Sequence, residues 1–140
     1  MREGLPLLKQ FEGCKLTAYQ DIVGVWTIGY GETKGVKPGM TISQGQADAM
    51  VQERYDEFEA GVKKLLKVPV TANELGALTC FAYNVGLFNL QTSTLLKMLN
   101  SGSPAKDIAA QFARWNKAGG KPVDGLTRRR AAEAQLFLKG

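Results

Sequence analysis

The sequence contains no histidine and only two cysteines among its 140 residues. Cys14 and Cys80 stand far apart, without the spacing of a metal-binding motif. Zinc sites are built mainly from cysteine and histidine, so this composition leaves such a site almost without ligands. Cysteine commonly packs as a small hydrophobic side chain, and we therefore expect two buried or half-buried free thiols. We expect no metal and no cofactor.

Long apolar runs are also missing. None approaches the roughly 18 residues that a membrane-spanning helix needs. The start, MREGLPLLKQFEG, has neither the apolar region nor the small-residue cleavage site of a secretory signal. We therefore expect a cytoplasmic protein without stable membrane insertion, unless an export or anchor segment has been removed ahead of it.

The composition is otherwise that of one soluble globular domain, with 44% hydrophobic and 22% charged residues. The net charge of +5 is unevenly placed. Residues 97–140 carry nine Lys or Arg against three acidic residues, whereas residues 48–59 carry five acidic residues against one Arg. This polarity favours an anionic partner for the C-terminal part. A solvated basic surface explains any single one of these residues equally well.

The N-terminal third predicts a short helix followed by a hairpin. Leu5, Leu8 and Phe11 have helical spacing over residues 5–12, and Gly13 stands where a helix usually stops. Residues 16–33 are rich in β-branched, aromatic and glycine residues, which is typical of short strands and tight turns. Glu12 is thus expected at the end of a helix, directly before a small β-hairpin.

The remainder predicts helices. Ser43 and Gln46 form a capping box for a long helix over 43–67, and Thr71 and Glu74 form a second one. Shorter helices are expected over 92–100, from Ser103-Pro104 to Trp115, and from Thr127 to Phe137. The predicted fold is α+β and mostly helical, a single domain over 1–140. It has a small lobe at about 13–42, a connecting helix at about 43–67 and a helical lobe at about 70–140, with a ligand cleft between the lobes.

Two carboxylates near the N-terminus have different predicted surroundings. Glu12 lies at the negative end of a helix dipole, which disfavours its ionised form and suits a proton donor. Asp21 falls in the turn-prone YQDIVG, where backbone amides and solvent keep a carboxylate ionised. A pair of carboxylates in such contrasting environments is typical of the acid and base of glycoside hydrolysis.

Thr27 is the third candidate in this segment. In the predicted strand VWTIGYG, Trp26, Ile28 and Tyr30 occupy one face, whereas Thr27 shares the other with Val25, Gly29 and Gly31. A hydroxyl on a face cleared by glycines can hold a water or touch a sugar. Alternatively, Thr27 is only a good strand residue and the glycines are turn residues.

The stretch Glu12-x8-Asp21-x5-Thr27, followed by the rest of TIGYG, resembles the catalytic segment of the phage lysozymes. These are the endolysins of glycoside hydrolase family 24, which include the T-even phage lysozyme and the lambdoid-phage endolysins. The resemblance continues in order through AYNVG at 82–86, TSTLLKMLN at 92–100, RW at 114–115 and GLTRRRAAEAQLF at 125–137. It therefore extends over most of the chain.

This resemblance implies a lysozyme-like fold and an endolysin muramidase that cuts the β-1,4 bond between N-acetylmuramic acid and N-acetylglucosamine, causing host cell lysis. It implies that Glu12 is the general acid, that Asp21 is the base or electrostatic partner, and that Thr27 positions the attacking water. The implied outcome is inversion, which needs carboxyl groups roughly 6.5–9.5 Å apart. The implied protein is a monomer that binds peptidoglycan after release from the host cytoplasm.

The resemblance also implies substrate contacts at Tyr83, Asn84 and Gly86, and an arginine, Arg129, that pairs near Glu12. Asn84 before Gly86 could instead be a helix end. Three basic residues in the first turn of a helix oppose its dipole, so we expect an acidic group to compensate them. We expect the neighbouring Arg128 and Arg130 to face solvent or the anionic wall.

Two positions depart from the family pattern. Many members have histidine where this chain has Glu32, and we expect Glu32 either to influence nearby carboxylates or to pair with a lysine such as Lys34. Some secreted relatives regulate activity through a cysteine in the region of Cys14, for which we keep the buried-thiol interpretation.

Three rival functions remain at this stage. The first is a peptidoglycan-binding module without catalysis, and the second is a chitinase-like glycosidase. The third is a basic nucleic-acid-binding protein, but no recognised nucleic-acid motif accompanies the charge, so we expect no nucleic-acid partner.

Overall fold

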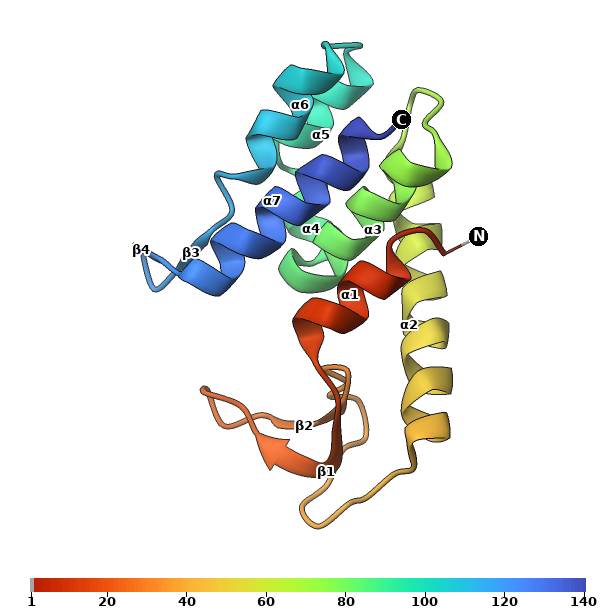
Figure 1. The fold of residues 1–140 in the computed structure, drawn as a ribbon, viewed down its shortest axis with the longest axis vertical. Helices are drawn as coiled ribbons and strands as arrows, with labels where there is room; N and C mark the ends of the chain where they lie inside the picture. The colour runs from red at the N-terminus through yellow and green to blue at the C-terminus, as the bar shows by residue number, and fades with distance from the viewer. Residues whose placement is uncertain (1) are drawn as a thin grey trace.

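A computed structural model describes residues 2–140. The chain forms a small lobe built around a hairpin, a long helix that runs along one side of the molecule, and a larger group of helices (Figure 1). The elements are α1 Leu5–Glu12, β1 Lys15–Gln20, β2 Trp26–Gly29, α2 Gln44–Leu65, α3 Ala72–Val85, α4 Leu87–Gln91, α5 Thr94–Asn100, α6 Ala105–Phe112, β3 Lys117–Ala118, β4 Lys121–Pro122 and α7 Asp124–Leu138. This arrangement confirms the predicted fold class.

The hairpin follows α1 directly. Strands β1 and β2 are antiparallel, with Tyr19 opposite Thr27 and Gln20 opposite Trp26, and their register shifts between Tyr19 and Lys15. A further bridge joins Ile28 to Glu32. The hairpin turn at residues 21–25 therefore points away from α1, while the end of β2 returns toward Glu12.

Helix α2 connects two separate hydrophobic clusters. Its capping box is formed as predicted, since Ser43 accepts from the Gln46 amide and Gln46 accepts from the Ser43 amide. The N-terminal half of the helix contributes Ala47, Val51 and Tyr55 to a cluster with α1 and the hairpin. The C-terminal half contributes Val62 to the core of the helical lobe. At 1.5 Å per residue its 22 residues span about 33 Å.

Helix α3 is the centre of the molecule. It packs against α1, α2 and α7, and its residues 76–82 are all buried. The rings of Phe81, Phe112 and Trp115 meet edge to face, with Phe112 also against Phe137. Aromatic pairs of this kind add to the stabilisation that burial alone provides. The capping box of Thr71 and Glu74 begins α3 as predicted.

Two predicted helix boundaries in the helical lobe are wrong. Helix α6 ends at Phe112 and not near Trp115, and the small hairpin β3–β4 follows it. Helix α7 begins at Asp124 and not at Thr127, whose hydroxyl accepts a hydrogen bond from Asn116 and caps no helix. The helix predicted over 92–100 is confirmed as α5, whereas the short helix α4 before it was not predicted.

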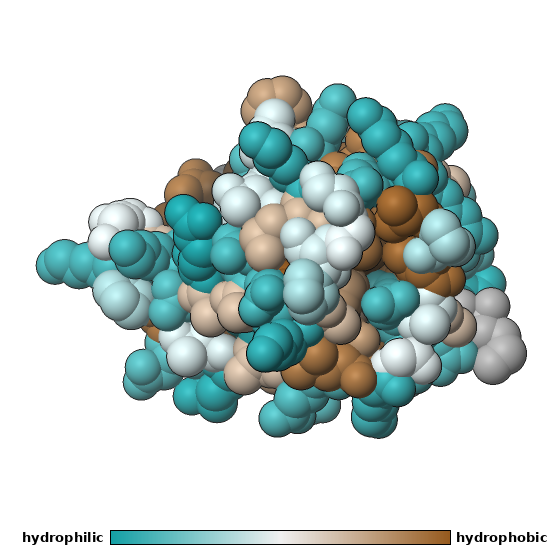
Figure 2. Space-filling model, turned by 90° about the horizontal axis from the view of Figure 1, so that it is seen from above, coloured by the Kyte–Doolittle hydropathy of each residue, from teal (hydrophilic) through white to brown (hydrophobic). Residues whose placement is uncertain are grey.

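The end of the helical lobe has a largely hydrophilic surface with separate hydrophobic patches (Figure 2). Within residues 2–140, no helix combines the length and the apolar character needed to cross a bilayer.

Candidate active site

Glu12 is the last residue of α1, and two glycines define its surroundings. Gly13 ends the helix with a φ of 68° and donates its amide to the Lys9 carbonyl. Gly31 has a φ of 84°, and a Cβ at this position would lie 2.8 Å from Glu12 Oε1. Any side chain at Gly31 would therefore meet the Glu12 carboxylate. Gly31 thus leaves room for the carboxyl group of Glu12.

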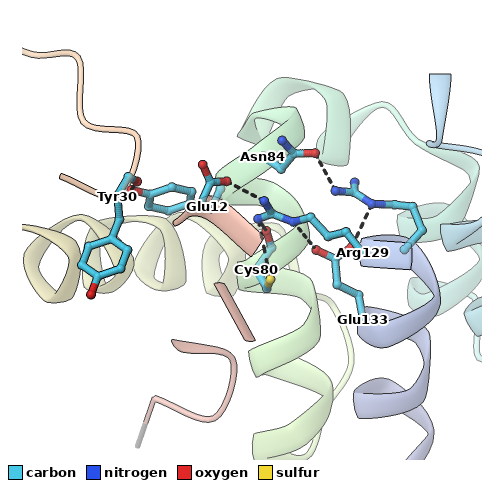
Figure 3. Close-up of polar contacts among 8 residues, drawn as sticks. Glu12, Tyr30, Cys80, Asn84, Arg129 and Glu133 are labelled. Atoms are coloured by element: carbon cyan, nitrogen blue, oxygen red, sulfur yellow. Dashed lines mark hydrogen bonds and ion pairs between the residues drawn. The ribbon is translucent and has the colours of Figure 1, made fainter. Parts of the chain in front are cut away.

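The Glu12 carboxylate is paired with Arg129 of α7. Arg129 Nη1 lies 2.5 Å from Glu12 Oε2, and the Glu12 side chain keeps 18% of its exposure. Figure 3 shows the Arg129 guanidinium lying between the carboxylates of Glu12 and Glu133. Its Nη2 also donates to the Cys80 carbonyl at 3.0 Å. The predicted position of Arg129 beside Glu12 therefore agrees with the structure.

Arg130 contradicts the prediction that it faces solvent or the wall. Its side chain is completely buried, donates to Asn84 Oδ1 at 2.5 Å and stacks on Phe81. Because α7 begins at Asp124, the three arginines do not lie in its first turn, and the argument from the helix dipole does not apply to them. Arg128, in contrast, is exposed as predicted.

Glu133 is a functional candidate that sequence reasoning missed. It is completely buried, and its two oxygens lie 3.1 Å from Arg129 Nε and 3.0 Å from Arg130 Nε. Burial raises the pKa of the Glu133 carboxyl, although both guanidiniums oppose this shift. The spacing of Glu133, four residues after one arginine and three after the other, was the signal in the sequence that could have revealed it.

Asp21 lies in the β1–β2 turn and holds it in shape. Its Oδ1 accepts hydrogen bonds from the amides of Val23 at 3.0 Å and Val25 at 2.8 Å. The side chain is only half-buried, and within residues 2–140 its Oδ2 takes part in no hydrogen bond. The predicted contact with backbone amides is thus present, and one oxygen stays available for chemistry.

The prediction of an open face around Thr27 is wrong. Thr27 is only 4% exposed, and its hydroxyl donates to the Val25 carbonyl at 2.9 Å. Gly29, on the same predicted face, lies beside Ile42 and Ala47, which belong to the connection before α2 and to α2 itself. These residues cover part of the face because the hairpin packs against α2. The role of Thr27 in positioning the attacking water stays a prediction.

Cavities flank the contact between Glu12 and Gly31. One of about 540 Å³ contains Glu12 in its wall, together with Gln10, Phe11, Asn84, Val123, Gly125, Leu126, Arg128 and Arg129. The other, of about 340 Å³, is lined by Gly31, Glu32, Thr33, Lys34, Arg54, Phe58 and Tyr83. The larger of these cavities lies between α1 and the helices α3 and α7, and the smaller lies between residues 31–34 and the helices α2 and α3. A sugar chain crossing Glu12 would meet polar and charged groups on both sides.

The three predicted substrate contacts differ in their surroundings. Asn84 is exposed in the larger of these two cavities, and within residues 2–140 its Nδ2 has no hydrogen-bond partner. Tyr83 donates its hydroxyl to the Tyr30 carbonyl at 2.7 Å, which joins α3 to the hairpin lobe. Burial raises the pKa of Tyr83, and the charges of Glu12 and Glu32 add to the shift. Gly86 caps α3 with a φ of 94° and lines neither cavity.

Glu32, one of the two positions expected to depart from the family pattern, forms a bidentate ion pair with Arg54 of α2. The two contacts measure 2.8 and 3.0 Å. This pairing raises the pKa of Arg54 above its ordinary value. The expected ion pair between the side chains of Glu32 and Lys34 is wrong, since Lys34 donates only its backbone amide to Glu32. Glu32 thus fastens the end of the hairpin to the long helix.

A cavity larger than these two lies elsewhere, and its wall contains no carboxylate. It measures about 840 Å³ at the C-terminal end of α2 and beside α5, where Lys64, Lys67 and Lys97 line it. Without an acidic group it offers no proton donor for glycoside hydrolysis. The cavities beside Glu12 are therefore better candidates for the active site than this larger one.

Both thiols agree with the prediction, since Cys80 is buried and free and Cys14 is half-buried and free. Burial raises the pKa of the Cys80 thiol well above its usual range. Over residues 2–140, no group of three or more His, Cys, Asp or Glu side chains is arranged to hold a metal ion.

Comparison with known proteins gives a consistent result. A family model described as phage lysozyme matches residues 9–133. The chain is 46% identical to the endolysin of Bacillus phage B103 over 98% of its own length. That alignment covers 53% of the relative, so the chain spans about half the length of this endolysin.

Solved structures agree in fold over nearly the whole chain. The endolysin of Escherichia coli O157:H7 phage FAHEc1 is 40% identical, with a TM-score of 0.88 over 99% of this chain and 92% of the other. The muramidase domain of SpmX from Asticaccaulis excentricus is 32% identical, with a TM-score of 0.91 over 99% and 96% of the two chains.

Proposed function

Because this chain belongs to the phage lysozyme family, we propose that it is an endolysin muramidase. Its substrate is bacterial peptidoglycan, in which it hydrolyses the β-1,4 bond between N-acetylmuramic acid and N-acetylglucosamine. The observation that carries this proposal is the Glu12 carboxyl, which lines a cavity, is fixed by Arg129 and has Gly31 directly beside it. Lysis of the host cell follows from cleavage of the wall.

Glu12 donates a proton to the glycosidic oxygen as the bond breaks. Its position at the border of two cavities lets a glycan lie across it, and the ion pair with Arg129 fixes its direction. An oriented general acid contributes about 10²–10⁴ to a rate. The proton must reach Glu12 before each cycle, which its partial exposure to solvent allows.

Asp21 acts as the second carboxylate, through the oxygen that the turn does not use. Thr27 assists through the lone pairs that its hydroxyl keeps while donating to Val25. In the inverting reaction that we propose, a water enters between the glycan and these groups. The new reducing end then has the opposite anomeric configuration, which NMR of freshly released fragments detects.

The experiment compares Glu12→Gln with Glu53→Gln. Glutamine keeps the shape of Glu12 but cannot serve as the acid, whereas Glu53 is an exposed residue of α2 far along the chain from the site. We expect Glu12→Gln to fold and to clear purified cell walls at least about 100-fold more slowly, with Glu53→Gln at the wild-type rate. Undiminished clearing by Glu12→Gln would sink the proposal.

Mass analysis of the released fragments decides between the proposed reaction and its two alternatives. New reducing ends on N-acetylmuramic acid are expected. Wall binding without any released sugar would indicate a non-catalytic peptidoglycan-binding module. Comparable cleavage of chitin, which lacks the lactyl-peptide group, would indicate a chitinase-like glycosidase.

As part of the same proposal, the enzyme works as a monomer and remains in the host cytoplasm until it reaches the wall. Sedimentation of the purified protein and fractionation of infected cells before lysis test these two points. A stable dimer, or an early signal in the envelope fraction, would contradict them.

A further inference from the structure

Two neighbouring arginines of α7 reach two different polar groups of the site. Arg129 donates to Glu12, and Arg130 donates to Asn84, at 2.5 Å in each case. Adjacent residues of a helix point about 100° apart, so something must hold both guanidiniums toward α3. Glu133 lies one turn later on α7, and its oxygens lie 3.1 and 3.0 Å from the Nε atoms of these arginines.

The contacts on α3 match this arrangement. Arg129 also donates to the Cys80 carbonyl, and Cys80 and Asn84 are four residues apart on the same face of α3. The two guanidiniums therefore span one turn of α3, with Glu133 behind them on α7. Glu12 and Asn84 lie at the outer ends of this chain of contacts, and both line the cavity of about 540 Å³ (Figure 3).

Stability does not explain why this cluster is charged. Arg130 and Glu133 are completely buried, and Arg129 is 4% exposed. Removing such charges from water costs several kcal/mol per ion, and apolar replacements of similar volume are often neutral or stabilising. The Arg130–Glu133 contact also lacks good hydrogen-bond geometry, as Arg130 Nε and Glu133 Oε1 have no hydrogen-bond partner. A geometric role for Glu133 accounts for what stability leaves unexplained.

We propose that Glu133 is a positioning residue that holds the proton donor Glu12 and the glycan contact Asn84 in fixed relation through Arg129 and Arg130. The inference rests on the proposed function, because it concerns the same site. One buried carboxylate orients two guanidiniums, and each guanidinium orients one group in the cavity wall. The distance between the acid and the bound sugar is thereby set by residues that never touch the sugar.

Glu133 also balances the charge around the acid. When Glu12 has given up its proton, Glu12 and Glu133 carry two negative charges, which Arg129 and Arg130 neutralise. Other titratable or charged groups near this cluster include Cys80 and Tyr83 from α3, Arg128 from α7 in the wall of the same cavity, and Glu32 with Arg54 beyond Gly31. Neutralising Glu133 alone leaves one uncompensated positive charge beside the acid.

Two variants separate this role from a merely structural one. Glu133→Gln keeps the shape and removes the charge. The double variant R130M/E133M replaces the buried pair by apolar side chains, keeps the cluster neutral and is expected to fold. Glu53→Gln is the matched control. All are assayed with a soluble peptidoglycan fragment over a range of pH, after urea unfolding has confirmed cooperative folding.

For Glu133→Gln we expect kcat to fall about tenfold or more, since small misplacements of catalytic groups are costly. The alkaline limb of its pH–activity profile is expected to move about one pH unit lower, because the extra positive charge favours the ionised form of Glu12. For R130M/E133M we expect the alkaline limb of the pH profile to stay at its wild-type position and kcat to fall about as much as in Glu133→Gln. We expect its KM to rise several-fold, because Asn84 loses its partner Arg130.

Wild-type kcat and KM in folded R130M/E133M, together with an unmoved limb in Glu133→Gln, would overturn the inference. Should Glu133→Gln fail to fold, R130M/E133M alone decides by its kcat and KM. These outcomes differ from failure of the proposed function, in which the wild-type protein itself releases no fragments.

Discussion

At the scale of single residues, Asp21 combines a structural duty with a proposed chemical one. Its Oδ1 accepts hydrogen bonds from the Val23 and Val25 amides. In the proposed function, the charge of the carboxylate serves catalysis and is not needed for these two hydrogen bonds. In Asp21→Asn the amide oxygen can still accept both hydrogen bonds. We therefore expect the free energy of unfolding to change by less than about 0.5 kcal/mol, while wall clearing falls at least about tenfold.

Asp21→Ala supplies the comparison, since it removes the acceptor as well. We expect it to lower the free energy of unfolding by about 1–2 kcal/mol in urea titrations, because two turn amides lose their partner. Equal stability of the two variants, or full activity in Asp21→Asn, would contradict this division of roles.

The sequence allowed the helix-end position of Glu12 and the backbone-amide contacts of Asp21 to be predicted, because both depend on local rules for helix ends and turns. The burial of Arg130 and the cover over Thr27 depend on how α7 and α2 pack, which no local pattern contains. Glu133 could be suspected only from its spacing to Arg129 and Arg130, since its burial results from the packing of α7 against α3. Glu32 likewise pairs with Arg54, 22 positions away in the sequence, and not with the side chain of its neighbour Lys34, and no local pattern predicts this.

At the scale of elements, α1 and α3 approach so closely that their glycines become necessary. A Cβ on Gly76 of α3 would lie 2.6 Å from the Gly4 nitrogen and 2.9 Å from Glu3 Cβ. Alanine normally stabilises a helix interior by about 1 kcal/mol relative to glycine. We expect Gly76→Ala to lower the free energy of unfolding by about 2–3 kcal/mol, because backbone atoms must move apart.

Gly45→Ala in the first turn of α2 is the matched control, since the nearest heavy atom to its Cβ is Ser43 Oγ at 3.9 Å. This change is expected to be neutral or to stabilise by up to about 1 kcal/mol. Urea unfolding of both variants checks the pair. Gly76→Ala at or above wild-type stability would contradict the close approach.

Elements with strong caps could be predicted within about two residues, as α2 and α3 demonstrate. The elements without such signals could not. Neither α6 nor α7 has a side-chain cap, and the two-residue strands β3 and β4 are too short for a hydrophobic period. Tertiary contacts such as Asn116 with Thr127 set those boundaries instead.

At the scale of the whole molecule, the parts of the fold meet around Tyr55. Its side chain is completely buried in the cluster that joins α1, the hairpin, α2 and α3, and its hydroxyl accepts a hydrogen bond from the Gly4 amide at 3.0 Å. Burial raises the pKa of Tyr55 to about 12. Burial likewise raises the pKa values of Tyr83 and Cys80. Folding thus requires all three groups in their neutral form.

The alkaline side of the stability curve follows from these shifts. A raised pKa in the folded state means that stability is fully present below the unfolded pKa and is lost as pH rises toward the folded value. The loss begins near pH 8.5, where an unfolded Cys80 ionises, and steepens above about pH 10 for the tyrosines. The pKa of Tyr55 is raised from 10.0 to about 12. As the pH rises from 10 to 12, Tyr55 alone therefore lowers the free energy of unfolding by about 2–3 kcal/mol.

Tyr55→Phe tests this assignment. At pH 8 the variant is expected to lose about 1–2 kcal/mol of unfolding free energy, because the Gly4 amide is left without its acceptor. Between pH 10 and 12, however, its stability should fall less steeply than that of the wild type, by up to about 1.4 kcal/mol per pH unit. Tyr19→Phe is the control, since Tyr19 is 38% exposed and meets water in both states. Urea titrations at several pH values give the slopes, and parallel curves for wild type and Tyr55→Phe would refute the role of this phenol in alkaline unfolding.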